Sequence, residues 1–153
     1  MSIVQELYTI YDKEQAKYRA RKSSQGLLLT EIRHNLAFLR EGLREGLAPT
    51  AIVSGLEDTH YRDARRQGVN LDGLQKKKLM PDTYAGIREF ARYRDWTTAR
   101  LVETVYERIA TLKKLVDGSA EVALRVRLKN LFKLLMVVLA HLEGRRLKIP
   151  AGG

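Results

Sequence analysis

The sequence predicts an all-α protein, an antiparallel four-helix bundle with an elongated N-terminal helix, on three observations. Apolar residues recur at steps of three and four along most of the chain, which is the spacing of amphipathic helices. No stretch of any length alternates apolar and polar residues in the manner of a β-strand. Residues 134–140 (LLMVVLA) form an apolar run inside a helical pattern, and a helix that is apolar nearly all round must be covered on several sides.

The first predicted helix spans residues 3–43 and is followed by Gly46, which ends it. Its two apolar stripes are Ile3, Leu7 and Ile10, then Leu28, Leu29, Ile32, Leu36, Leu39 and Leu43. Between the stripes, residues 12–25 are rich in Lys and Arg and carry no aliphatic side chain larger than alanine. The helix either runs through solvent there or breaks near residues 23–26. A continuous helix would exceed ~60 Å, so its N-terminal end would project from the bundle.

The second predicted helix begins at Pro49, because proline suits the first turn, where its missing N–H is not needed. Ile52, Val53, Leu56 and His60 share one side of this helix. Gly68 is expected to end it in a left-handed conformation, with the following Val69 packing back on the last turn. Residues 70–81 are expected to form a connecting loop.

The third predicted helix runs from about residue 83 to residue 117, with Asp82 as its N-cap. Its apolar seam has the alternating three and four spacing of a coiled coil, and consists of Val102, Val105, Ile109, Leu112 and Val116. Gly118 ends this helix and Ser119 caps the last one. So short a connection predicts that the last two helices are antiparallel neighbours. We expect a single domain over residues 1–146 and a flexible C-terminal tail over residues 147–153.

Composition limits the functional classes. The chain has 28 Lys and Arg against 18 Asp and Glu, a net charge of +10, and no cysteine. Without cysteine there are no disulfides, thiolate metal sites or cysteine nucleophiles. The sequence has no secretory signal pattern and no apolar run long enough for a membrane span. We therefore expect a cytoplasmic protein whose surface attracts polyanions.

Two Glu-x-x-His spacings, Glu31 to His34 and Glu57 to His60, have the pattern of di-iron bundle ligands. A helical projection argues against such a site, because His34 falls opposite the apolar stripe and Glu31 falls roughly 110° from its centre. The serines have no adjacent histidine, and no phosphate-binding or dinucleotide-binding glycine loop is present. We expect no metal, no cofactor, no small-molecule substrate and no catalysis.

Basic residues form the first candidate binding surface. Arg125, Lys129 and Lys133 repeat every four residues in a segment, between Glu121 and Glu143, that contains no acid. The other candidates are arginines beside aromatic residues, Arg88 and Arg92 near Tyr93 and Trp96, and Arg62, Arg65 and Arg66 next to Tyr61. Guanidinium groups fork onto phosphates and flat rings stack on unpaired bases. These residues predict sequence-nonspecific binding of single-stranded RNA or DNA.

The favoured hypothesis is a non-catalytic interaction module that associates with itself or with a protein partner through a candidate interface. That interface consists of Ile3, Leu7, Ile10 and Trp96. An isolated apolar stripe at the end of a projecting helix needs something to cover it, and a second copy supplies the same patch again. Nucleic-acid binding through the basic residues is the alternative.

Overall fold

The computed structural model describes residues 2–14 and 23–147, and every regular element in them is helical. The α-helices are α1 (Ile3–Glu14), α2 (Ser24–Glu45), α3 (Pro49–Gly55), α4 (Thr59–Arg66), α5 (Thr98–Leu115) and α6 (Glu121–Leu142). Short 3-10 helices, η2 (Leu71–Gly73), η3 (Pro81–Tyr84) and η4 (Arg88–Tyr93), lie between α4 and α5. The predicted all-α class is confirmed.

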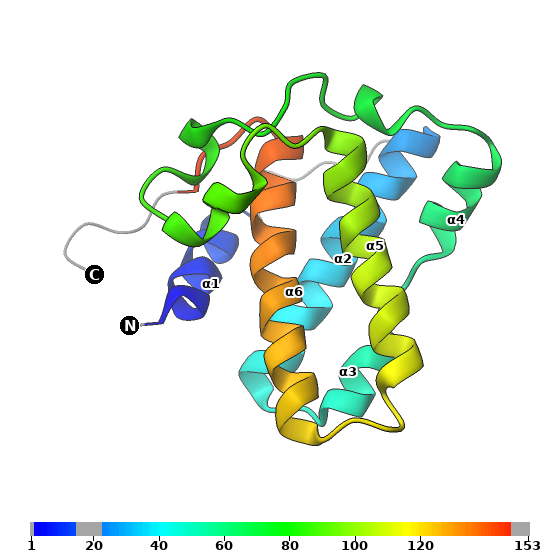
Figure 1. The fold of residues 1–153 in the computed structure, drawn as a ribbon, viewed down its shortest axis with the longest axis vertical. Helices are drawn as coiled ribbons and strands as arrows, with labels where there is room; N and C mark the ends of the chain where they lie inside the picture. Colours follow the sequence, from blue (N-terminus) through cyan, green and yellow to red (C-terminus); the bar gives the residue numbers. More distant parts are fainter. Residues whose placement is uncertain (1, 15–22, 148–153) are drawn as a thin grey trace.

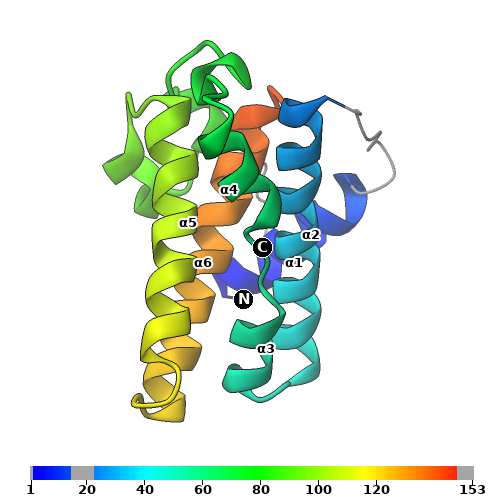
Figure 2. The same ribbon diagram turned by 90° about the vertical axis from the view of Figure 1, so that its right-hand side faces the viewer.

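Helix α6 is the centre of the fold, and the apolar run predicted to be covered is covered by its own chain. Every residue from Leu134 to Leu142 is buried. Helices α1, α2, α3 and α5 all pack against α6 (Figures 1 and 2). Each fully buried Leu, Val or Phe contributes about 1.5–3 kcal/mol, so α6 supplies a large part of the stability of the fold.

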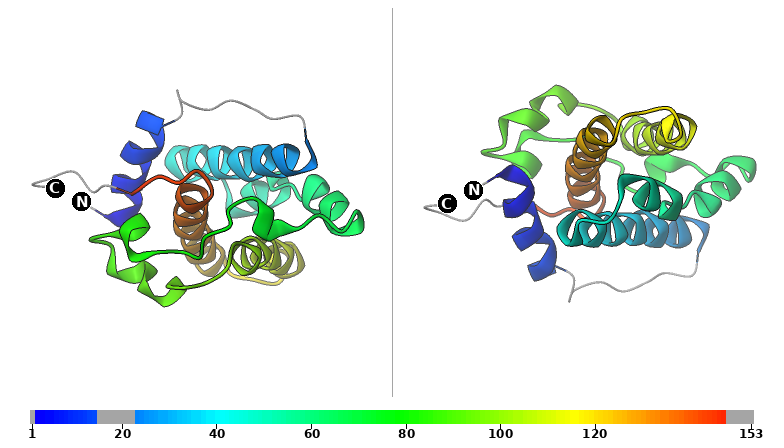
Figure 3. Two further views of the ribbon diagram at one scale, coloured as in Figure 1. Left: turned by 90° about the horizontal axis from the view of Figure 1, so that it is seen from above. Right: turned by 90° about the horizontal axis from the view of Figure 1, so that it is seen from below.

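The predicted elongated N-terminal helix is wrong, because α1 and α2 are separate helices that run at a steep angle to one another (Figure 3). Helix α2 begins after Ser23, whose hydroxyl accepts a hydrogen bond from the Gly26 N–H at 3.0 Å. Helix α1 lies against α6, where the Tyr8 ring meets the Phe132 ring with their centroids 5.0 Å apart. Whether the chain is helical throughout residues 12–26 depends partly on residues 15–22, which lie outside the described residues. Gly46 ends α2 with a φ of 70°, as predicted.

The second predicted helix is divided into α3 and α4. The division follows Gly55, where an added Cβ atom would lie 2.2 Å from the Phe38 ring, so only glycine allows α3 to approach α2 this closely. Leu56 then adopts an extended conformation, with a ψ of 137°. The predicted end of α4 is confirmed, because Gly68 has a φ of 70° and the Val69 N–H donates to the Ala64 carbonyl.

The third predicted helix begins later than expected, at Thr98. Thr97 is its N-cap and accepts a hydrogen bond from the Arg100 N–H at 3.2 Å. The chain before it forms η3 and η4. Gly86, between these two helices, and Asp95, after η4, both have positive φ. Asp82 therefore lies within η3 and caps no α-helix. Helices α5 and α6 are antiparallel neighbours as predicted (Figure 1), although the residue at the N-cap of α6 is Ala120, one position after Ser119.

The predicted flexible tail begins too early. Leu147 is buried, and its N–H donates to the carbonyl of Thr83 at 2.8 Å, so the folded domain extends through this residue. Residues 148–153 of the predicted tail lie outside the described residues. No helix in the described ranges has the length and hydropathy needed to cross a membrane.

Candidate functional site

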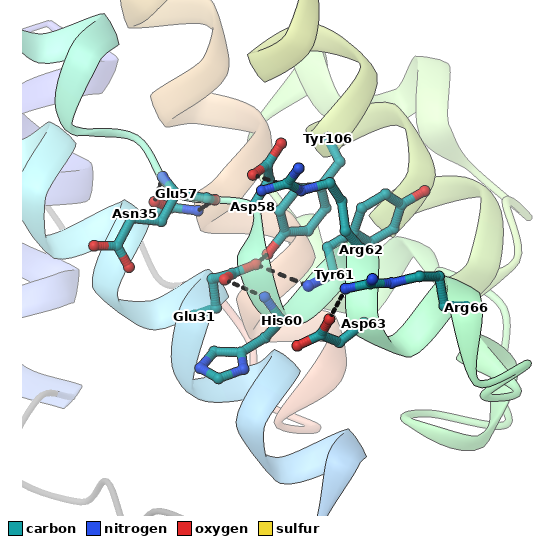
Figure 4. Close-up of polar contacts among 10 residues, drawn as sticks. All are labelled: Glu31, Asn35, Glu57, Asp58, His60, Tyr61, Arg62, Asp63, Arg66 and Tyr106. Atoms are coloured by element: carbon teal, nitrogen blue, oxygen red, sulfur yellow. Dashed lines mark hydrogen bonds and ion pairs between the residues drawn. The ribbon is translucent and has the colours of Figure 1, made fainter.

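Helix α4 is anchored by a buried carboxylate on α2. The Glu31 carboxylate accepts hydrogen bonds from the N–H groups of His60 (2.7 Å) and Tyr61 (3.1 Å) and from the Tyr106 hydroxyl (2.8 Å; Figure 4). Both amides belong to the first turn of α4, whose N–H groups have no partner inside the helix. The helical projection placed Glu31 away from the apolar stripe of α2, yet its side chain is buried, because α4 covers this side of α2. Glu31 acts as the N-terminal cap of α4 from a different helix.

Asn35 holds the chain at the break between α3 and α4, one turn along α2 from Glu31. Its side-chain amide donates to the Glu57 carbonyl and its oxygen accepts from the Glu57 N–H, both at 2.8 Å (Figure 4). Both backbone polar groups of Glu57 are therefore paired although this residue is outside any helix. Two polar residues of α2 thus fix the position and start of α4.

Tyr106 completes this network from α5. Burial raises the pKa of its hydroxyl well above 10.0, and the Glu31 carboxylate raises the pKa further. The hydroxyl therefore stays protonated and donates to Glu31. The Tyr106 ring stacks on the Tyr61 ring, with a centroid distance of 4.1 Å and an interplanar angle of 4°. The network is fully partnered, which indicates a structural role.

The three predicted arginines of α4 each have a carboxylate partner. Arg62 Nε lies 3.2 Å from Asp58 Oδ1, and Arg65 Nη1 lies 3.0 Å from Glu103 Oε1. Arg66 forms an ion pair with Asp63. The fold therefore places Arg62, Arg65 and Arg66 on one short helix, but neighbouring acids compensate their charge.

The three residues of the predicted basic stripe of α6 lie in different environments. Arg125 donates to the Leu47 carbonyl and lies 3.5 Å from Glu121 Oε1, so it faces the start of α3 and the beginning of its own helix. Lys129 is exposed and has no carboxylate within ion-pair distance in the described ranges. Lys133 is half-buried, with its Nζ 3.0 Å from Glu89 Oε2.

A concentration of positive charge lies in a pocket formed by η4, α5 and α6, which we call the η4 pocket. It has a volume of about 360 Å³, and four of the side chains that line it are cationic, against one carboxylate. The cations are Arg92, Arg108, Arg127 and Lys133, and the carboxylate is Glu89. Thr111 and Asn130 add neutral hydrogen-bonding groups, while the buried Phe90, Tyr93 and Leu112 form its apolar part.

Tyr93 orients two of these cations. Its hydroxyl accepts a hydrogen bond from Arg108 Nη2 at 3.1 Å, and the Arg92 guanidinium carbon lies 5.8 Å from its ring centroid. The ring itself is held edge-on against Trp96, with centroids 4.9 Å apart. Because Tyr93 is only 5% exposed, it acts as a fixed support for the two guanidinium groups.

A second hollow adjoins the η4 pocket between α1, α2 and α6. Its volume is about 760 Å³, and Asn130 and Lys133 line both hollows. Lys129 and Arg44 add positive charge, and no carboxylate is among the described side chains that line it. Arg40 also lines it, but its guanidinium lies over the Tyr8 and Tyr11 rings at 5.5 and 5.4 Å. The two hollows make α6 the centre of one continuous basic surface.

The sequence predicts this surface only in part. Arg92, Lys129 and Lys133 were predicted and lie in the two hollows, whereas Arg88 and Arg125 line neither. Arg127 and Asn130 are three residues apart, so a helical projection of α6 alone would have placed them together. No sequence signal indicates Arg108, because its position depends on how α5 packs against η4.

The predicted interface residues are largely covered within the chain. Leu7 and Ile10 are buried, and Ile3 is half-buried against the same core. The expectation that this stripe needs a partner is therefore wrong, because α6 covers it. Trp96 is also half-buried, and the Arg100 guanidinium carbon lies 3.7 Å from its ring centroid.

The described residues contain no group of three or more metal-binding side chains. His34 is exposed, as the helical projection predicted. His141 is buried, and its Nε2 lies 2.8 Å from the Thr98 hydroxyl, which donates to the Gln75 carbonyl. Burial lowers the pKa of His141 below its ordinary value of 6.5. The neutral imidazole therefore joins α6 to the start of α5.

Comparison of this chain with protein-family models, with curated protein sequences and with solved structures gives no match. The class that the fold and the site define is an all-α protein with a basic surface and a basic pocket.

Proposed function

We propose that this protein is a non-catalytic module, with α2, α3–α4, α5 and α6 in an antiparallel four-helix arrangement, that binds single-stranded nucleic acid without sequence preference. The binding surface, which we call the α6 surface, consists of Arg92, Arg108, Arg127, Lys129 and Lys133. One observation carries this proposal: the η4 pocket is lined by four cations against one carboxylate. On α4, by contrast, every arginine of the predicted cluster has an acidic partner.

The chemistry of the surface favours phosphate over an acidic protein surface. Three of the four cations of the η4 pocket are arginines, whose planar forks match phosphate oxygens. Protein interfaces depend on aromatic or aliphatic anchors at their centres. The large hydrophobic residues exposed in the described ranges are few and include no aromatic residue: Leu27, Leu47, Met80, Val122 and Val126.

The same surface is poorly suited to recognising bases. Phe90 and Tyr93 are 2% and 5% exposed, so their rings offer little face on which a base can stack. Binding would therefore depend on the phosphate backbone. The logarithm of the binding constant should then fall linearly with the logarithm of the salt concentration, with a slope of about −0.7 for each phosphate contacted on a single strand.

A pair of charge-reversal variants tests this function. In Arg127→Glu with Lys129→Glu, both changed side chains are exposed and have no carboxylate within ion-pair distance in the described ranges. The matched control is Arg62→Glu with Arg66→Glu on α4, which changes the net charge equally. With a labelled single-stranded RNA in low salt, we expect the first variant to lose about a hundredfold in affinity and the control to lose little.

Two results would overturn the proposal. One is failure of the unmodified protein to bind single-stranded RNA or DNA at low salt. The other is an equal loss of affinity in both variants, which would mean that only the total charge matters.

Exposed valines on α6 favour a second candidate, the self-associating or protein-docking module predicted from the sequence. Val122 and Val126 are one turn apart and 76% and 53% exposed, and Leu47 is 43% exposed. Light scattering would show a dimer or larger assembly that Val122→Asp with Val126→Asp dissociates. A monodisperse monomer at high concentration would remove this candidate.

A further inference from the structure

We infer that the η4 pocket binds the terminal phosphate monoester of a single nucleic-acid strand, while the second hollow, around Lys129 and Arg44, binds internal phosphodiesters. This inference rests on the proposed function and specifies which part of the strand each hollow takes. It follows from the size of the pocket, its charge, its neutral lining and its continuity with the second hollow.

The pocket has the size for a single end group. Its volume of about 360 Å³ is at the small end of the range of ligand pockets, which is roughly 300–1,000 Å³. Three elements, η4, α5 and α6, contribute to its wall. A hollow of this size accepts one phosphate with part of its nucleotide and is too small for a folded or paired region.

The charge of the pocket favours a monoester over a diester. A phosphate monoester carries about −1.5 to −2 at pH 7, whereas each internal phosphodiester carries a single negative charge. Arg92, Arg108 and Arg127 come from three different elements and line the pocket, where Lys133 pairs with the single carboxylate, Glu89. A cluster of cations in one hollow therefore gains more from the doubly charged end than from an internal phosphate.

The neutral groups suit the remainder of the terminal nucleotide. Asn130 and Thr111 offer uncharged hydrogen-bond donors and acceptors for sugar or phosphate oxygens. The buried side chains of Phe90, Tyr93 and Leu112 give the pocket an apolar part against which a sugar packs without base recognition.

The second hollow continues the path of the strand. Asn130 and Lys133 line both hollows, and beyond them lie Lys129 and Arg44, with no carboxylate among the described lining residues. A strand whose end occupies the η4 pocket would therefore pass Lys133 and continue over α6 toward α2. The second hollow meets internal phosphates, for which one cation each is sufficient.

The test compares oligonucleotides of about eight nucleotides that share one sequence and differ only at their ends. One carries a 5′-phosphate, one a 3′-phosphate, and one hydroxyl groups at both ends. We expect one phosphorylated end to bind about tenfold more tightly than the hydroxyl form, the gain expected from charge-assisted hydrogen bonds to the added charge. The phosphorylated end that gives the gain identifies the polarity of the strand.

Two matched variants locate the effect. Arg108→Gln with Arg127→Gln should weaken binding of all three oligonucleotides and bring the phosphorylated and hydroxyl forms to the same affinity. Arg44→Gln with Lys129→Gln should weaken all three oligonucleotides and retain the preference. Circular dichroism checks that each variant is folded, and Arg127→Gln alone, which changes an exposed side chain, serves if the double variant is unfolded.

The outcomes separate this inference from the proposed function. Equal affinity for all three oligonucleotides would overturn the terminal-phosphate site and leave nonspecific binding in place. Absence of binding to any of them would overturn both. A preference that survives Arg108→Gln with Arg127→Gln would place the end group outside the η4 pocket and would also overturn the inference.

Discussion

The α4 side and the α6 side of this protein are built from the same residue types, arginines beside tyrosines, yet they differ in how charge is partnered. On the α4 side, a buried carboxylate caps the helix and each of the arginines Arg62, Arg65 and Arg66 meets an acid. Around α6, four cations share a pocket with one carboxylate. The two sides therefore differ in the partnering of charge more than in composition, and the proposed function assigns binding to the side whose charge is less fully partnered.

The source of the partners explains why the two sides diverge. Glu31 reaches α4 from α2, and Glu103 reaches Arg65 from α5. Neither acid is close in sequence to the group that it satisfies. On α6 the described segment between Glu121 and Glu143 has no acid of its own, and among the acids of neighbouring elements only Glu89 lines the η4 pocket.

The largest expected effect concerns α1, which forms one wall of the second hollow. Leu7 is fully buried, so Leu7→Asp should lower the free energy of unfolding by about 4 kcal/mol or more, because it leaves a cavity and buries a charge. Urea unfolding measures this loss. Gln5→Asp, a change at an exposed position of the same helix, is the control. If Leu7→Asp instead dissociated an assembly and left the free energy of unfolding unchanged, the interface predicted from the sequence would be correct.

The next effect tests the α4 side directly. Glu31→Ala removes the acceptor of three hydrogen bonds, and each buried donor left without a partner costs about 1–3 kcal/mol. We expect a loss of about 3 kcal/mol in urea unfolding, with a smaller loss for Glu31→Gln, which keeps an acceptor oxygen. Nucleic-acid binding by the folded fraction should be unchanged. A loss below about 0.5 kcal/mol, the range of ordinary surface changes, would contradict the capping role.

A smaller effect concerns His141, a buried polar residue at the C-terminal end of α6. Burial lowers the pKa of His141 from 6.5, so below this pH the unfolded chain binds a proton more readily than the folded chain. The stability that the neutral His141 contributes is therefore fully present above pH 6.5, and it declines as the pH falls toward the lower pKa of the folded state. Thermal unfolding over about pH 5.5–7.5 should show this decline in the unmodified protein and in His34→Gln. The same decline in His141→Gln would show that another group is responsible.

Much of the fold follows from local patterns. The apolar run of residues 134–140, the cap at Ser23, the left-handed Gly46 and Gly68, and the short link between α5 and α6 all act within a few residues. They are readable because the physical cause is near in sequence. The break between α3 and α4 is different, since it depends on Phe38 packing over Gly55 and on Asn35 pairing with Glu57. Spacing in residues 49–68 alone does not indicate it.

The same limit applies to the candidate site. The four-residue repeat of Lys129 and Lys133 was visible, as was Arg92 beside Tyr93. The partnering that distinguishes Arg65 from Arg127 was not, because it depends on which acids the tertiary fold brings near. The helical pattern over residues 83–97 also concealed η3 and η4, although Thr97 is a good N-cap residue at which a later helix start was readable.

The central claim is that nucleic acid binds the unbalanced charge around α6 and not the balanced charge on α4. Chemical-shift mapping of the backbone amides, with an unlabelled single-stranded RNA added at low salt, tests it most directly. The account predicts shifts at Arg127, Asn130 and Lys133 and at the η4 residues around Arg92, with residues 60–66 unchanged. Shifts centred on residues 60–66, or no shifts at all, would contradict it.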